Sequence, residues 1–201
     1  FGDDLVDHFT YVLASDGDLM EGISHEAISI AGHLKLARLI VLYDDNNITI
    51  DGSLDLAESG DALARFEAAG WNAVRIDGHD FEAIEDAIAA AQNSDKPSLI
   101  ACRTVIGYGA PNKQGTSGVH GAPLGDDEIG LTRETLGWDA PAFEIPAELR
   151  DAWRMAGRAH ASARKAWEQR LAEQSAETRN RFDRVTAGDL PSGLDSAVDS
   201  Y

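Results

Sequence analysis

The chain has 201 residues, of which 43% are hydrophobic, and a formal net charge of -18 at pH 7. This size and apolar content are enough for a folded domain with a core of ordinary size. An acidic surface would repel nucleic acids and anionic membranes, so we expect neither as a partner. With one cysteine, Cys102, no secretory signal and no apolar run near the roughly 20 residues that span a bilayer, the sequence predicts a cytoplasmic protein.

Short apolar runs alternate with helical patterns along the first half of the chain. Residues 9–14 are aromatic, β-branched or apolar and end at a turn-forming Ser-Asp-Gly-Asp cluster, which predicts a strand followed by a loop. Apolar residues at helical spacing over 23–36 predict a helix, and the run 39–43, closed by Asp-Asp-Asn-Asn, predicts a second strand. The alternation continues with a helix over 61–69, a strand over 73–76, a helix over 81–91 and a strand over 98–105. This order predicts an α/β fold, a parallel sheet with helices on both faces.

The pattern changes after the last predicted strand. A glycine-rich loop over 107–125 has the length of a functional or disordered segment. Beyond it, a long helix is predicted, with one apolar side that serves for packing and consists of Leu149, Trp153, Ala156, Ala163, Ala166, Trp167 and Leu171. We expect a partial α/β domain over 1–145, a C-terminal helical extension over 146–186 that packs on it, and an exit segment or linker over 187–201.

Polar residues follow the first two predicted strands, and ligands of parallel α/β sheets bind beyond the carboxyl ends of strands. The first loop offers the Asp16 carboxylate and Gly17, and the second offers the Asn46 amide and the carbonyl of Ile48. Such oxygens suit magnesium. Each loop alone is typical of an ordinary turn or solvated loop. However, Asp16 and Asn46 lie thirty positions apart with one crossover helix between them, which would bring them together.

The sequence around these residues resembles the transketolase family. Asp16-Gly17 followed by Asn46-Asn47 is similar to the thiamine diphosphate signature, in which Gly-Asp-Gly and a later Asn hold the diphosphate through a metal. Ser15 replaces the first glycine of that signature, which leaves the ligand position intact. Segments similar to transketolases cover nearly the whole chain: 18–26, 31–36, 43–46, 50–52, 70–71, 77–80, 106–109, 120–124, 136–138 and 143–146. The resemblance implies the thiamine diphosphate-binding fold.

Roles for single residues follow from the resemblance. It implies that Asp16, Asn46 and the carbonyl of Ile48 bind Mg²⁺ or Ca²⁺, and that Gly17 and Asn46 contact the diphosphate. His120 would be the catalytic residue and would contact both cofactor and substrate, because an imidazole can donate to phosphate or to a sugar hydroxyl. Without the motif, a histidine in a glycine-rich loop is a surface residue. Two readings of Glu21 stay open, a carboxylate favoured at a helix start and a residue of the dimer interface.

The implied activity is reversible transfer of a two-carbon ketol group from a ketose phosphate to an aldose phosphate, in the pentose phosphate pathway, by a homodimer. In this family a glutamate that contacts the pyrimidine of the cofactor comes from another domain of the partner subunit. No segment here resembles that domain, so we expect a fragment that is inactive alone. The alternatives are another thiamine enzyme, such as a dihydroxyacetone synthase or a deoxyxylulose phosphate synthase, and a non-catalytic α/β subunit. The segments 24–26 and 120–123 favour transketolase over the deoxyxylulose phosphate synthase.

Overall fold

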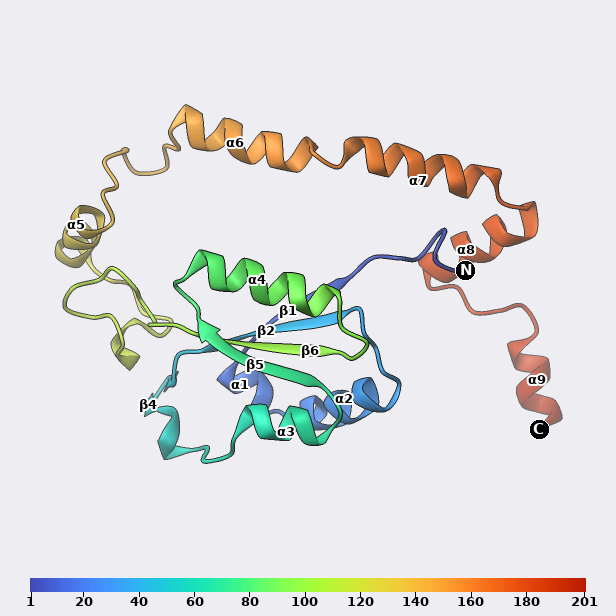
Figure 1. The fold of residues 1–201 in the computed structure, drawn as a ribbon, viewed down its shortest axis with the longest axis horizontal. Coiled ribbons are helices and arrows are strands. Elements are labelled where there is room, and N and C mark those ends of the chain that lie inside the picture. Colours follow the sequence, from blue (N-terminus) through green and yellow to red (C-terminus); the bar gives the residue numbers. More distant parts are fainter. The chain divides into compact units, whose positions relative to one another are not determined.

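The computed structural model describes residues 1–201 and divides them into two compact units. The larger unit is His8–Asp139, and the smaller one combines Phe1–Asp7 with Ala140–Tyr201. Figure 1 shows that the larger unit holds the sheet and that the smaller one is helical. The predicted packing of the C-terminal extension on the α/β domain stays a prediction.

Four parallel strands form the sheet of the larger unit, in the order β1-β2-β6-β5. Their bounds are β1 Thr10–Ser15, β2 Leu39–Asp45, β5 Asn72–Asp77 and β6 Ser98–Arg103. The crossovers contain α2 Gly22–His33, α3 Ala62–Ala68 and α4 Phe81–Gln92. Between β2 and α3 lie the short hairpin of β3 Ile48–Thr49 and β4 Gly52–Ser53 and the 3-10 turn Leu54–Leu56. The predicted parallel α/β fold is confirmed.

Both faces of the sheet are covered, and the alternation of side chains along the strands explains how. Val41 and Tyr43 of β2 pack with Phe66 and Trp71 on the face that carries α2 and α3. Their neighbours on the other face belong to a second cluster, centred on Ile40, Ala91 and Ile100 and formed with α4. In Figure 1, α4 lies on one side of the sheet, and α1, α2 and α3 lie on the other.

A short helix, α1 Asp16–Met20, stands where the sequence predicted a loop. The backbone amide and the hydroxyl of Ser15 both donate to the carboxylate of Asp18, at 2.8 Å each. These bonds give the backbone amide and the hydroxyl of Ser15 a hydrogen-bond partner at the start of the helix. The chain therefore enters a helix directly from β1. Asp16 and Gly17 therefore occupy the first turn of a helix.

The predicted glycine-rich loop after β6 is confirmed, with one 3-10 turn, Ser117–Val119, inside it. Side chains tie this loop to the helix that follows, α5 Asp126–Thr135. The buried carboxylate of Glu128 accepts bonds from the amide and the side chain of Asn112, at 2.8 and 2.9 Å, which lowers the pKa of Glu128. The ammonium of Lys113 donates to the carbonyl of Leu124 at 2.7 Å. These hydrogen bonds hold the middle of the loop against α5 and its N-terminal approach.

The smaller unit differs from the predicted single long helix. It contains α6 Ala147–Arg158, α7 Ala161–Glu173, α8 Ala176–Ala187 and α9 Leu194–Ser200. The interruption between α6 and α7 follows Gly157, a residue with poor helix propensity, which the apolar spacing alone did not reveal. Helix α9 lies in the segment 187–201, for which little structure was predicted. None of the helices is both long and apolar enough to cross a membrane.

Candidate functional site

A pocket of about 710 Å³ opens at the carboxyl ends of β1 and β2. Parallel register places these ends side by side, with Ser15 of β1 opposite Asp44 of β2. All the residues proposed from the sequence line this one pocket: Asp16, Gly17, Asn46, Ile48 and His120. The long loop after β6 brings His120 to the same place, together with Gly121.

Asp16 is the buried acidic group of the pocket. Its side chain lies at the start of α1, and the residue is only 5% exposed. One carboxylate oxygen, Oδ1, accepts a hydrogen bond from the hydroxyl of Tyr43, whereas the other, Oδ2, is buried without a partner. Burial raises the pKa of the Asp16 carboxyl, the Tyr43 bond opposes this shift, and the charges of Asp45 and Asp44 add to it. A cation beside Oδ2 would relieve both the burial and the repulsion.

Asn46 stands in the turn that closes β2. Its amide nitrogen donates to the carboxylate of Asp44 at 2.9 Å, and its amide oxygen accepts from the backbone amide of Ile48 at 2.9 Å. Asn47 continues the turn with a φ of 62°, a left-handed conformation that asparagine tolerates. An amide oxygen has two acceptor sites, so Asn46 keeps one for a ligand. The turn therefore holds a neutral oxygen at the edge of the pocket.

Gly17 leaves open space beside α1. A Cβ atom built on Gly17 would meet no atom within 4 Å. The packing of the protein itself therefore does not require glycine here, and the space is available to a ligand that approaches the backbone.

Sequence reasoning missed two sets of polar contacts at this edge of the sheet. One is the Tyr43 hydroxyl, which reaches Asp16 from β2. The other is the buried Asp45, which accepts from Arg75 at 2.9 Å and from Arg103 at 3.2 Å. Both sets of contacts depend on which strands are neighbours in the sheet. Polar contacts at a strand end leave no periodic pattern in the sequence, so the Tyr-Asp-Asp-Asn segment indicated only where the strand ends.

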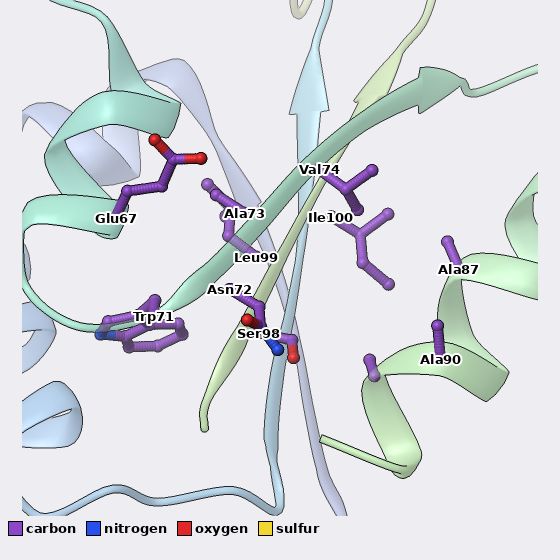
Figure 2. Close-up of a pocket in the computed structure, with 11 residues that line it drawn as sticks. Glu67, Trp71, Asn72, Ala73, Val74, Ala87, Ala90, Ser98, Leu99 and Ile100 are labelled. Atoms are coloured by element: carbon purple, nitrogen blue, oxygen red, sulfur yellow. The ribbon is translucent and has the colours of Figure 1, made fainter. Parts of the chain in front are cut away.

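A second pocket, of about 380 Å³, lies near the amino ends of β5 and β6, away from these residues. Figure 2 shows its lining between α3 and α4, with Ala87 and Ala90 on one side and Glu67 and Trp71 on the other. Apolar side chains dominate it, and Glu67 is its one ionisable group. It offers no set of groups for chemistry.

The fold and the first pocket define a class of protein. A parallel α/β unit that presents a buried carboxylate, an amide oxygen and an open glycine beyond its carboxyl edge is suited to bind a phosphate group through a metal ion. The family model for transketolase, thiamine diphosphate binding domain, matches residues 1–191. The chain belongs to this family.

Individual proteins that are similar to this chain are also transketolases. A transketolase from Cereibacter sphaeroides is 58% identical over all 201 residues, which cover 30% of that relative. The structure of a transketolase from Leishmania mexicana superposes with a TM-score of 0.87 and 38% identity, covering 96% of this chain and 30% of that one. A transketolase from Pichia stipitis in complex with sedoheptulose 7-phosphate gives a TM-score of 0.84 at 38% identity, covering 94% and 29% of the two chains. The chain thus spans about 30% of the length of the curated relatives it matches.

Proposed function

We propose that the intact protein is a transketolase, which transfers a two-carbon ketol group reversibly from a ketose phosphate to an aldose phosphate. The observation that carries this proposal is the unpartnered, buried Oδ2 of Asp16 in a pocket that Gly17, Asn46, Ile48 and His120 also line. A carboxylate oxygen buried without a partner destabilises a fold, so its presence in the pocket points to a ligand that would satisfy it. The substrate class rests on the sugar phosphate bound to the Pichia stipitis relative.

In this proposal the cation is Mg²⁺ or Ca²⁺, held by the carboxylate of Asp16, the amide oxygen of Asn46 and the carbonyl of Ile48. No group of three or more His, Cys, Asp or Glu side chains lies close enough together to hold a metal ion. The protein would therefore supply one negatively charged ligand, the carboxylate, and two neutral oxygens. The diphosphate and water would complete the coordination, as is usual for magnesium. Thiamine diphosphate, when bound, supplies a nucleophilic carbon and an electron sink for breaking a bond beside a ketose carbonyl.

The remaining parts of the proposal concern assembly. We propose a cytoplasmic homodimer of the pentose phosphate pathway, in which the partner subunit supplies the pyrimidine side of each cofactor site. The 201 residues would then hold the metal- and diphosphate-binding half of the cofactor site and be inactive alone.

A dihydroxyacetone synthase-like enzyme and a non-catalytic α/β subunit are the alternative functions. A coupled assay of the intact protein with a ketose phosphate donor and an aldose phosphate acceptor separates a transketolase from both alternatives, because only a transketolase uses both substrates.

His120→Ala in the intact protein should lower turnover by about 100-fold and change the affinity for thiamine diphosphate much less. The reason is that His120 is exposed on the loop side of the pocket, where a substrate would enter, whereas the residues proposed to hold the diphosphate lie on α1 and after β2. Loss of one positioned proton donor costs about 100-fold or more in rate. Steady-state kinetics and calorimetry on the same sample measure the two effects. Normal turnover at saturating cofactor would remove His120 from catalysis.

Gly17→Ala should weaken the binding of thiamine diphosphate with magnesium by roughly tenfold, equivalent to about 1.4 kcal/mol. The new methyl group would occupy space that the diphosphate needs, but it meets no protein atom within 4 Å. The apo protein should be as stable as wild type or slightly more stable, since alanine favours a helix over glycine by about 1 kcal/mol.

Gly22→Ala is the matched control. Gly22 is the first residue of α2, also has no atom within 4 Å of a built Cβ, and does not line the pocket. Calorimetry should show unchanged cofactor binding for this variant. Equal losses for Gly17→Ala and Gly22→Ala would mean that the open space at Gly17 does not face the cofactor.

A further inference from the structure

The two oxygens of the Asp16 carboxylate have different surroundings. Oδ1 accepts the hydrogen bond of the Tyr43 hydroxyl, and Oδ2 has no partner although it is buried. Tyr43 itself is 4% exposed and belongs to the core cluster on the α2 face of the sheet. Its ring is buried in the same cluster as Leu19 of α1, and this packing restricts the position of the hydroxyl.

This contact follows from the meeting of β1, α1 and β2. Tyr43 pairs with Ala14 in the parallel register, two residues before Asp16 begins α1. The tyrosine side chain therefore projects from the sheet beneath the first turn of the helix. A tyrosine hydroxyl is protonated at neutral pH, so it donates its hydrogen to the carboxylate.

We propose that Tyr43 is a positioning residue for the metal ligand, and that it makes Asp16 a one-oxygen ligand that favours Mg²⁺ over Ca²⁺. The inference rests on the proposed function. A carboxylate anchored through Oδ1 presents only Oδ2 to a cation. Magnesium demands near-ideal octahedral geometry with short bonds, which one oxygen satisfies, whereas calcium also accepts carboxylates through both oxygens at longer distances.

Tyr43→Phe in the intact protein tests this, because phenylalanine keeps the ring and removes only the hydroxyl. Calorimetric titration of Mg²⁺ and, separately, of Ca²⁺ in the presence of thiamine diphosphate gives both affinities. We expect the magnesium affinity to fall about tenfold, the range seen when groups that orient a metal ligand are removed, and the calcium affinity to fall less.

Tyr11→Phe is the control. Tyr11 lies in β1, its hydroxyl also has one partner, Gln92 at 2.6 Å, and it does not line the pocket. This variant should change neither metal affinity. Equal losses of both cations in Tyr43→Phe, no loss of either, or a variant that fails to fold would each overturn the inference, because the hydroxyl would then be structural or dispensable. Wild-type protein that binds no metal with thiamine diphosphate would instead overturn the proposed function.

Discussion

Asp16→Asn is expected to abolish magnesium-dependent binding of thiamine diphosphate, with a loss of more than about 100-fold in metal affinity. Removing a group that only supports a ligand already costs 10- to 100-fold, and here the sole charged ligand that the protein supplies is lost. Asn46→Ala should have nearly as large an effect, because it removes a neutral ligand and the turn that presents Ile48. Calorimetry with and without magnesium measures both.

The control for Asp16→Asn is the thermal stability of the variant without metal, which shows whether the substitution damages the fold. The substitution keeps the shape of the side chain and removes a buried charge whose Oδ2 has no partner. Thermal unfolding without metal should therefore show a variant at least as stable as wild type. A variant that binds magnesium and thiamine diphosphate with wild-type affinity would show that the metal assignment is wrong. A variant with a collapsed melting temperature would show that Asp16 serves the fold.

Gly32→Ala is expected to destabilise the larger unit by about 3 kcal/mol or more, the upper range for overpacking of a core. Gly32 lies near the end of α2, where the helix approaches the turn after α3. A Cβ atom there would lie 1.8 Å from the backbone oxygen of Ala69 and 3.2 Å from the ring of Trp71. A backbone oxygen cannot rotate away as a flexible side chain can, so the helix or the turn must shift. Urea denaturation of variant and wild type gives the difference in free energy of unfolding.

Gly22→Ala, in the same helix, again provides the comparison. Both substitutions replace a glycine of α2 by alanine, and only the one at Gly32 meets backbone. Gly22→Ala should leave stability unchanged or slightly higher. If Gly32→Ala were equally harmless, α2 and the turn at Ala69 would have to be further apart than the structure places them.

Much of the fold could be predicted because its signals are local. The apolar runs of β2 and β6 and the spacing in α2 and α4 repeat at the periods of strand and helix. Helix α1 was missed because Ser15 and Asp18 in Ser-Asp-Gly-Asp have the composition of a turn as well as of a helix cap. The break after Arg158 was missed because apolar spacing continues across it.

The sequence by itself determined that Asp16 and Asn46 directly follow two neighbouring strands, because parallel connections place successive carboxyl ends at one edge. Only the tertiary structure decided that β6 lies between β2 and β5, so that Arg103 and Arg75 both reach Asp45. It also decided that the Tyr43 hydroxyl donates to one carboxylate oxygen of Asp16 and that the other oxygen has no hydrogen-bond partner. The physical reason is that the order and packing of strands depend on long-range burial. The alternation of side chains along a strand shows on which face of the sheet a side chain lies. It does not show which residues of other strands and helices that side chain contacts.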